Sequence, residues 1–490
     1  MSKMLRRVLT VIPAAAVQAL WILLLVKWLS PYAAYITLAL SVAAVLLVLF
    51  IIIKRDETAY KILWLLVILT VPVAGALLYL LFGNRRTARP LRKRLRRVQE
   101  AGQPAPLPCG GTPFEGEKRM EQTVRWLEHK TGYPLMRAED VRYYPLGDAM
   151  YPDMLTDLRA AKKTIYLEYF IIEPGEMWQS IVDILAQKVR EGLDVRVMYD
   201  DLGSISTFNF SNALALEKLG IRCVTFNPLL ALKGTANYRD HRKMLIVDNA
   251  VAYSGGVNLA DRYINREHPY GHWKDTGVRL EGGAVKNLTV LFLEMWNSVK
   301  TTDTDFARYL PDPGYTAKGR GFVQPYGDNP LDGEPVGENV YMNIIKNAKD
   351  YVYFTTPYLI VSDELSRELR LAAKRGVDVR IITPGIPDKK AVFQVTRSYY
   401  AGLVRDGVRI YEYTPGFIHA KQCVCDGETA AVGTINLDYR SLYLHFENGV
   451  FLYDCEAIKD IRADFDGLFP ICQEVTEEYR SGRSAVLRIG

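Results

Sequence analysis

Three long stretches near the N-terminus are apolar and contain no charged residue. They run over Val8–Val26, Ala33–Ile53 and Ile62–Phe82, with 19, 21 and 21 residues. A helix needs about 20 such residues to cross the hydrocarbon core of a bilayer, and buried helices of soluble proteins are rarely so long and uniformly apolar. A cleaved signal peptide does not fit, because more apolar sequence follows the first stretch. The pattern predicts a membrane anchor over residues 1–83 with two to three transmembrane helices.

The basic residues around these stretches indicate an orientation. If all three stretches span, six Lys or Arg residues lie on the side of the N-terminus and nine on the side of the main domain. Basic residues favour the cytoplasmic side, so this excess predicts a multi-pass protein of the cell membrane with a cytoplasmic main domain. Pro72 and Gly75 also allow the third stretch to be kinked or partly re-entrant, which would change the count.

A strongly basic segment follows the third stretch. Residues 83–97 carry eight Lys or Arg and no acidic residue. A solvated linker would tolerate this composition, but the position directly after a membrane segment favours contact with anionic membrane lipid. Glu100–Pro113 is rich in Pro and Gly and is typical of a linker. Residues 84–137 are therefore interpreted as a basic juxtamembrane segment and linker.

After the linker, the pattern changes to that of a soluble α/β domain. Lys162–Ile172 is rich in β-branched and aromatic residues and predicts a strand. A helix is expected near Trp178–Glu191, and Asp194–Asp200 predicts a second strand. This strand–helix–strand order implies parallel strands with helices covering the sheet.

The same order of elements occurs twice. Segments that begin at Ala161, Arg190 and Leu216 match segments that begin 187, 184 and 187 residues later. One match can arise by chance, but several in the same order indicate an internal repeat. The sequence therefore predicts an α/β fold of two pseudo-symmetric lobes packed together, over residues 138–310 and 320–475.

A short motif is repeated within these lobes. Each copy has a histidine, a lysine two residues later and an aspartate five residues after that: His241, Lys243 and Asp248, and then His419, Lys421 and Asp426. A glycine, an asparagine and an acidic residue follow in both copies: Gly255, Asn258 and Asp275, and then Gly433, Asn436 and Glu447. The chain has only six histidines, so two in one frame indicate a shared chemical role.

A histidine and a lysine on one face of a strand suit chemistry at a phosphodiester. The histidine can attack phosphorus or donate a proton near neutral pH. The lysine points to the same side, about 6.5 Å along the chain, and can stabilise charge on phosphate oxygens. Two copies provide one histidine as nucleophile and another as acid for the leaving alcohol. The lysines supply the positive charge, so we expect neither a metal nor another cofactor.

The repeated asparagines and glycines have supporting roles in this hypothesis. Asn258 and Asn436 can donate further hydrogen bonds to the phosphate oxygens. Gly255, Gly256 and Gly433 allow the backbone to approach closely. These residues are therefore assigned to substrate binding.

The repeated acidic residues have two different roles. Asp275 and Glu447 can each accept the Nδ1–H of a histidine, and crosswise pairing between the lobes is one arrangement. Asp248 and Asp426 belong to the catalytic motif, but a structural role is favoured for them, in which each orders a strand end and its lysine.

Overall charge and cysteine content narrow the classes of function. The formal net charge of +6 resides largely in the basic segment and does not indicate a nucleic-acid partner. The six cysteines show neither a C-x-x-C motif nor zinc spacing. Cys423 and Cys425 alternate along a strand, so they face one side and cannot easily bridge each other. A reducing compartment fits this usage.

The two motifs resemble the paired H-x-K-x4-D motifs of the phospholipase D superfamily. "HRKMLIVD" with "SGGVN", and "HAKQCVCD" with "GTIN", carry that resemblance. "LLVILTVPVAGALLYLLFGNRR", "HWKDTGVRLEG" and "GTINLDYRSLYLHFENGV" are similar to bacterial cardiolipin synthases. The resemblance runs from about Ala33 to near the C-terminus. Two departures are the extra apolar stretch Val8–Val26 and the cysteines of "KQCVCDG", where aliphatic residues are more usual.

This resemblance implies a phosphatidyltransferase with two phospholipase D-like lobes. It implies transfer from one phosphatidylglycerol to another, giving cardiolipin and glycerol through a phosphohistidine, with His241 as nucleophile and His419 as general acid. A phospholipase D hydrolase, a phosphatidylserine synthase and a nuclease are alternatives, and a lipid-binding scaffold is the alternative from another class. A nuclease has no need of membrane segments, and two complete motifs argue against a scaffold. The acceptor alcohol and the oligomeric state stay open.

Overall fold

The computed structural model of this protein describes most of the chain. The described stretches are residues 16–24, 32–54, 58–83, 88–101, 112–228, 237–303, 305–310 and 319–480. The chain forms two compact units, Met1–Pro90 with Leu229–Asn237, and Leu91–Pro228 with Tyr238–Gly490.

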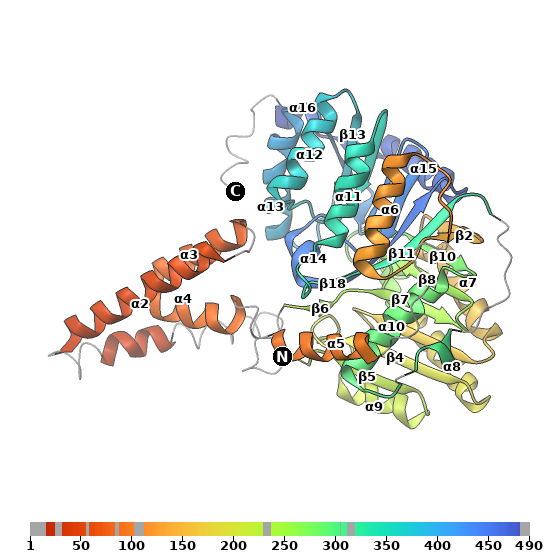
Figure 1. The fold of residues 1–490 in the computed structure, drawn as a ribbon, viewed down its shortest axis with the longest axis horizontal. Helices are drawn as coiled ribbons and strands as arrows, with labels where there is room; N and C mark the ends of the chain where they lie inside the picture. Colours follow the sequence, from red (N-terminus) through yellow and green to blue (C-terminus); the bar gives the residue numbers. More distant parts are fainter. Residues whose placement is uncertain are drawn as a thin grey trace. The chain divides into compact units, whose positions relative to one another are not determined.

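The first unit is helical (Figure 1, red to orange). A helix covers residues 16–24, and α2 covers Ala33–Ile53. Among the described residues, one helix is long and apolar enough to cross a membrane, Ala34–Ile53. The rest of the first expected span, Val8–Val26, lies outside the described residues.

The third apolar stretch does not form one helix. It is divided into α3 (Thr58–Thr70), α4 (Pro72–Leu78) and the π-helical turn η2 (Tyr79–Gly83). The break falls at Val71, whose φ of −134° and ψ of 78° are not helical. Pro72 is the first residue of α4, where its missing N–H removes no helical hydrogen bond.

The first lobe is built on a seven-stranded sheet with the order β2-β10-β8-β7-β3-β4-β5. Its strands are β2 (Asp140–Tyr144), β3 (Thr164–Tyr169), β4 (Asp194–Asp200), β5 (Arg222–Phe226), β7 (Lys243–Val247), β8 (Val251–Gly255) and β10 (Gly277–Glu281). Its helices are α7 (Gly147–Ala160), α8 (Glu176–Arg190), α9 (Phe210–Lys218) and α10 (Val285–Val299). Ile165, Leu167 and Leu185 lie in its fully buried core.

The second lobe repeats this order in a larger sheet, β1-β11-β18-β17-β16-β12-β13-β14-β19. Its strands are β1 (Met136–Arg137), β11 (Phe322–Asp328), β12 (Tyr351–Thr355), β13 (Asp378–Pro384), β14 (Arg409–Tyr413), β16 (Gln422–Cys425), β17 (Thr429–Gly433), β18 (His445–Tyr453) and β19 (Cys472–Glu474). Its helices are α11 (Val336–Asn347), α12 (Asp363–Lys374), α13 (Lys390–Val404), α14 (Tyr439–Leu444), α15 (Ala457–Leu468) and α16 (Thr476–Arg480).

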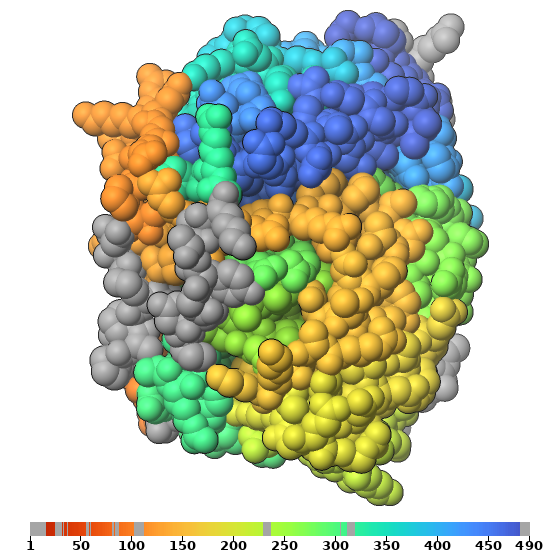
Figure 2. Space-filling model, turned by 90° about the vertical axis from the view of Figure 1, so that its right-hand side faces the viewer, coloured from red at the N-terminus to blue at the C-terminus, as the bar shows by residue number. Residues whose placement is uncertain are grey.

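The two sheets confirm the predicted fold of two repeated α/β lobes. The parallel neighbours β3-β4-β5 of the first lobe correspond to β12-β13-β14 of the second, and antiparallel β7 and β8 correspond to β16 and β17. Figure 2 shows the first lobe (yellow to green) below the second lobe (blue), with the two lobes in contact across the face in view. Cys423 and Cys425 are buried and are not bonded to each other.

Part of the expected linker is folded. α5 covers Arg89–Ala101 and α6 covers Lys118–Thr131. Met120, Val124 and Leu127 make one buried face of α6, at the helical spacing of three or four residues. This face packs against α11 and β11 of the second lobe, and β1 also joins the second sheet by pairing with β11.

Two short parallel strand pairs join the lobes. β6 (Arg239–Asp240) of the first lobe pairs with β18 of the second. β9 (His272–Lys274) of the first lobe pairs with β15 (Gly416–Ile418) of the second. Each pair lies directly beside a histidine of the repeated motif, so the lobe interface positions the candidate site.

Candidate active site

Each motif histidine is held by the backbone of the opposite lobe. His241 follows β6, and its main-chain N–H donates to the carbonyl oxygen of Phe446 at 2.9 Å. His419 follows β15, and its N–H donates to the carbonyl of Lys274 at 2.7 Å. Phe446 and Lys274 each precede an acidic residue, Glu447 and Asp275, so each histidine faces a carboxylate of the other lobe.

The imidazole–carboxylate pairs cross between the lobes. His241 Nδ1 lies 2.9 Å from Glu447 Oε1, and His419 Nδ1 lies 2.6 Å from Asp275 Oδ2. Both carboxylates are fully buried. An ionised carboxylate only accepts hydrogen bonds, so ionised Asp275 places the proton of His419 on Nδ1, and the ionised form of Glu447 does the same for His241. This arrangement leaves Nε2 of both histidines for a substrate.

The motif lysines are buried beside the histidines. Lys243 Nζ donates to the carbonyl of His241, and Lys421 Nζ donates to the carbonyl of His419. Burial lowers the pKa of Lys243 to about 8 and that of Lys421 to about 7, although the nearby carboxylates oppose this effect. An anionic ligand at the site favours the charged form of both lysines.

Both histidines are neutral at pH 7 without a substrate. Burial, followed by the charges of Lys243 and Lys421, holds the pKa of His241 well below its usual value. Burial and Lys421 lower the pKa of His419 to about 4, although Asp275 opposes the change. A neutral imidazole has a lone pair on Nε2, which is the form that a nucleophile needs.

The two carboxylates differ in their surroundings. Glu447 accepts hydrogen bonds from the hydroxyls of Thr434 and Ser441 as well as from His241. Burial raises the pKa of Glu447 to about 7, although Lys243 opposes this effect. Burial would raise the pKa of Asp275, but its interactions with His419 and Lys421 outweigh this effect and lower that pKa. His419 therefore faces the more strongly ionised carboxylate.

Comparison with known proteins identifies the family of this two-histidine site. A family model described as "Cardiolipin synthase, PLD-like domain" matches residues 154–296 and 341–469, one stretch in each lobe. A model described as "Phospholipase_D-nuclease N-terminal" matches residues 39–84. The chain belongs to the phospholipase D-like family of cardiolipin synthases.

Relatives within this family match most of the chain. A protein named cardiolipin synthase from Geobacillus kaustophilus is 33% identical over 436 residues, which cover 87% of this chain and 86% of the relative. Another protein of that name, from Alkalihalophilus pseudofirmus, is 33% identical over 82% of this chain and 81% of its own. An uncharacterized Streptococcus mutans protein is 44% identical over 88% of this chain and 94% of its own.

A solved structure shares the fold of the family. The crystal structure of phosphatidylserine synthase from Haemophilus influenzae superposes with a TM-score of 0.56 at 16% identity. The match covers 76% of this chain and 98% of that enzyme. At this identity the likeness shows the fold alone.

Aromatic side chains that the motif does not mark surround both histidines. The ring of Phe170, which follows β3, meets His241 edge-on with centroids 4.8 Å apart. Tyr263 and Trp273 lie with centroids 5.5 Å from that of His419. These rings exclude water and contribute to the burial that keeps the imidazoles neutral. Trp273 lies within the conspicuous stretch "HWKDTG", but its spacing alone gives no sign of this role.

The protein holds the two repeated asparagines in different ways, Asn258 by its side chain and Asn436 by its main chain. Asn258 Oδ1 accepts from the N–H of Ile171 at 3.0 Å, and its Nδ2 donates to Tyr263 Oη at 2.8 Å. One N–H of this amide is left for a ligand. The main-chain N–H of Asn436 donates to Ser441 Oγ at 2.9 Å, and Ser441 is also a donor to Glu447. Both asparagines thus support the residues around the histidines.

The repeated glycines allow two strands to approach each other. A Cβ atom at Gly255 would lie 2.3 Å from the carbonyl oxygen of Thr276, and one at Gly433 would lie 2.4 Å from that of Asn448. A Cβ atom at Gly256 would lie 2.0 Å from Asp275 Oδ1. The close approach is therefore to the backbone directly after Asp275 and Glu447, and it gives these carboxylates room to reach the histidines.

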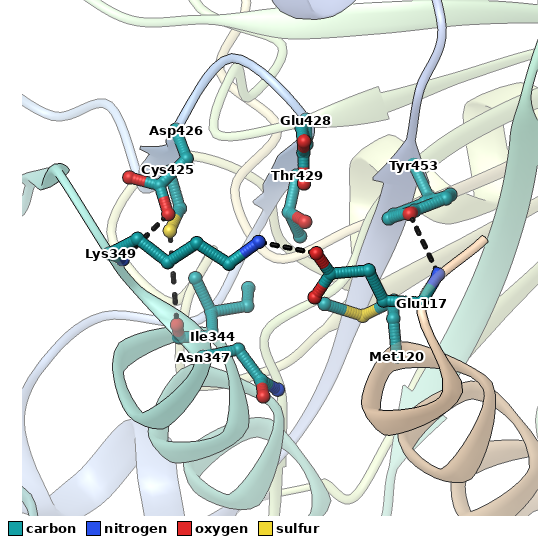
Figure 3. A pocket seen from close by; sticks show the side chains of 10 residues that line it. All are labelled: Glu117, Met120, Ile344, Asn347, Lys349, Cys425, Asp426, Glu428, Thr429 and Tyr453. Atoms are coloured by element: carbon teal, nitrogen blue, oxygen red, sulfur yellow. Dashed lines mark hydrogen bonds and ion pairs between the residues drawn. The ribbon is translucent and has the colours of Figure 1, made fainter.

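The motif aspartates lie away from the histidines. Each accepts hydrogen bonds from backbone N–H groups where a neighbouring strand begins. Asp248 accepts hydrogen bonds of 2.7, 2.7 and 2.8 Å from the N–H groups of Lys162, Lys163 and Thr164. Asp426 binds the N–H groups of residues 349–351 in the same way, at 2.8 to 3.0 Å. Figure 3 shows Asp426 turned toward Lys349 in a small pocket at the edge of the second lobe. This geometry supports the structural role for both.

We expect Asp248→Ala to reduce stability rather than chemistry. The change removes three charge-assisted hydrogen bonds, and alanine tolerates the left-handed φ of 55° less well than aspartate. The free energy of unfolding should fall by about 1–3 kcal/mol. Asparagine tolerates this φ, so Asp248→Asn should lower the free energy of unfolding by less than Asp248→Ala does. Thermal denaturation in detergent and turnover per folded molecule test this: a large drop in turnover with unchanged stability would contradict it.

No metal site accompanies these residues. Among the residues that the structure describes, no group of three or more His, Cys, Asp or Glu side chains is placed to hold a metal ion. The positive charges beside the histidines are those of Lys243 and Lys421.

Proposed function

We propose that this protein is a cardiolipin synthase that transfers a phosphatidyl group between two phosphatidylglycerol molecules. Family membership supports an enzyme that acts on phospholipids, and the relatives from G. kaustophilus and A. pseudofirmus bear this name over most of both chains. The observation that carries the mechanism is the crossed pairing of His241 with Glu447 and of His419 with Asp275. It presents two Nε2 atoms beside two buried ammonium groups.

In the first half-reaction, His241 Nε2 attacks the phosphorus of one phosphatidylglycerol. An N–P bond forms, and the P–O bond to the headgroup glycerol breaks. His419 gives its Nε2 proton to the departing glycerol oxygen. The bound phosphodiester is anionic, so it favours the protonated imidazole of His419, which the ionised carboxylate of Asp275 also stabilises.

In the second half-reaction, a glycerol hydroxyl of another phosphatidylglycerol attacks the same phosphorus. His419 takes the proton of this hydroxyl, the N–P bond breaks and the electron pair returns to His241. Lys243 and Lys421 stabilise the negative charge on the phosphate oxygens in both transition states. The products are cardiolipin and glycerol, and the enzyme is regenerated.

The acceptor distinguishes this function from its alternatives. Water as acceptor would give phosphatidic acid, which is the product of a phospholipase D hydrolase. Serine as acceptor, with a CDP-linked donor, would give phosphatidylserine. The test is to incubate the purified protein with phosphatidylglycerol in mixed micelles and identify the lipid products. Cardiolipin and glycerol in equal amounts support the proposal, and phosphatidic acid as the main product would reject it.

The proposed location is the cell membrane, with several membrane segments and the lobes at the cytoplasmic face. The match of residues 39–84 to an N-terminal family module and the apolar helix Ala34–Ile53 support membrane association. Full-length protein should need detergent for extraction, whereas a chain that starts near Arg97 should leave the membrane fraction or bind it only peripherally. Fractionation with high salt tests this: release of full-length protein by salt alone would contradict membrane insertion.

A further inference from the structure

The third apolar stretch folds back on itself. Tyr60 Oη, near the start of α3, donates to the carbonyl oxygen of Gly83 at 3.1 Å. The rings of Trp64 and Tyr79 meet edge-on, with centroids 5.4 Å apart. Further along, α3 and α4 touch so closely that a Cβ atom at Gly75 would lie 2.5 Å from the carbonyl oxygen of Val67. The paired residues come closer together in sequence toward Val71, from 60 and 83 to 67 and 75. This pattern is that of an antiparallel helical hairpin with its turn at Val71.

The arms of this hairpin are too short to cross a bilayer. The first arm, α3, has 13 residues, and the second arm consists of α4 with 7 residues and η2 with 5. At 1.5 Å per residue, α3 is about 20 Å long, while the hydrocarbon core is about 30 Å thick. Bulky apolar side chains nevertheless cover its outer surface: Ile62, Leu63, Leu66, Leu69, Leu77 and Leu80 are all exposed. Such a surface is stable in hydrocarbon and costly in water.

Neighbouring helices indicate the depth of the hairpin. It packs against Ala44, Leu47, Val48 and Ile51, which all belong to the C-terminal half of α2. At the turn, the N–H of Ala74 lies 3.4 Å from Oε1 of Gln18, near the centre of the first apolar stretch. The hairpin therefore reaches the middle of α2, the described helix that is long enough to span, and no further.

The turn and the open end of the hairpin differ in their polar groups. The hairpin turn carries no charge, and the N–H groups of Val71 and Gly75 donate to the carbonyl oxygens of Val67 and Val71. Gln18 provides a polar partner where lipid could not. The open end is flanked by basic residues, with Lys54 and Lys61 before it and Arg85 after it.

From these contacts we infer that the third apolar stretch is a re-entrant hairpin, which enters and leaves one leaflet on the same face of the membrane. Only the first stretch and α2 then cross. The N-terminus, both ends of the hairpin and the basic residues 83–97 share one face, and Lys27 is the basic residue of the other. The basic residues are distributed far more unequally between the two faces than they would be with three spans. Because basic residues favour the cytoplasmic side, this distribution assigns the shared face to the cytoplasm.

The hairpin also determines which lipids the enzyme meets. Because the chain returns to the face it left, the lobes draw their substrate from the cytoplasmic leaflet, into which the hairpin inserts. This consequence rests on the proposed function, but the hairpin itself does not.

Cysteine labelling tests the hairpin without any need for catalysis. Asp56→Cys, Asn84→Cys and Ser30→Cys would be made singly, with Cys109→Ser throughout, and the parent without a new cysteine gives the background. A membrane-impermeant maleimide is applied to spheroplasts and to inverted vesicles. We expect the substitutions at 56 and 84 to react in inverted vesicles, and the one at 30 to react in spheroplasts.

The outcomes separate the two topologies. Reaction at 56 and 84 from opposite faces would mean that the third stretch crosses the membrane, and it would overturn the hairpin. Val71→Cys provides a second test, because a hairpin turn at mid-depth should be unreactive from both faces. Reaction of this cysteine from the outer face would also overturn it. Cardiolipin formation measured on the parent protein shows separately whether the proposed function holds.

Discussion

Replacing His241 with alanine should abolish phosphatidyl transfer and prevent any labelling of the protein by its substrate. Among the residues that the structure describes, only His241 and His419 combine an Nδ1–carboxylate contact with a neighbouring motif lysine, and His419 is needed as the acid. The loss of kcat should be about 10⁴-fold or more, because removing a nucleophile removes the covalent pathway. The measurement is single-turnover reaction with phosphatidylglycerol labelled in the phosphatidyl group, followed by trapping of acid-labile, base-stable phosphoenzyme.

The matched variant is His419→Ala, which should behave differently. It should slow turnover yet still accumulate label on His241, above all with a substrate whose leaving group needs no protonation. Label on His419 in the His241→Ala protein, together with none in His419→Ala, would reverse the two roles. Absence of label from active wild-type enzyme under the same trapping conditions would exclude the covalent mechanism and favour direct transfer between two lipids.

Replacing Lys243 or Lys421 with methionine should lower kcat by about 10²–10³-fold, which is the usual cost of one donor to a developing oxyanion. Methionine keeps the volume of the side chain but removes the charge, so binding of the anionic phosphate and stabilisation of the transition state are both lost. Steady-state kinetics with phosphatidylglycerol in mixed micelles measure this. Activity should survive exhaustive chelation, since the lysines supply the charge that a metal would otherwise provide.

Lys188→Met is the matched control for these variants. Lys188 is also buried and donates to the carbonyl of Ala161 and to Glu191, but it lies on α8 away from the histidines. Its loss should reduce thermal stability and leave kcat nearly unchanged. Near-normal kcat in both Lys243→Met and Lys421→Met would remove the electrostatic role assigned to them.

The sequence was sufficient to predict the two lobes and the residue types that meet between them. A repeat leaves the same residue types at the same spacing, so alignment of the two copies identified Asp275 and Glu447 as counterparts. Two facing lobes can pair each carboxylate with the histidine of its own or of the other copy. The imidazole–carboxylate contacts show that the pairing is crossed, and the strand pairs β6–β18 and β9–β15 bring these partners together.

Other features could not be read from spacing because they depend on contacts between distant segments. Thr434 and Ser441 bind Glu447, but hydroxyl residues are common and no pattern marks them. The asparagines match in position, yet Asn258 is occupied by Ile171 and Tyr263, which only the folded chain brings near. Pro72 and Gly75 allowed a kinked or a partly re-entrant third stretch, but composition alone does not show which of the two forms.

The crossed carboxylates make the two halves of the gene product depend on each other. A lobe alone would keep its histidine and lysine but lose the group that orients the imidazole, so an ancestral single-lobe polypeptide could work only as a pair of copies. After duplication and fusion, damage to either carboxylate disables the histidine of the other half. Natural selection therefore acts on the two repeats together, and exchange of one repeat between divergent relatives should yield inactive hybrids unless both partners of each crossed pair still fit.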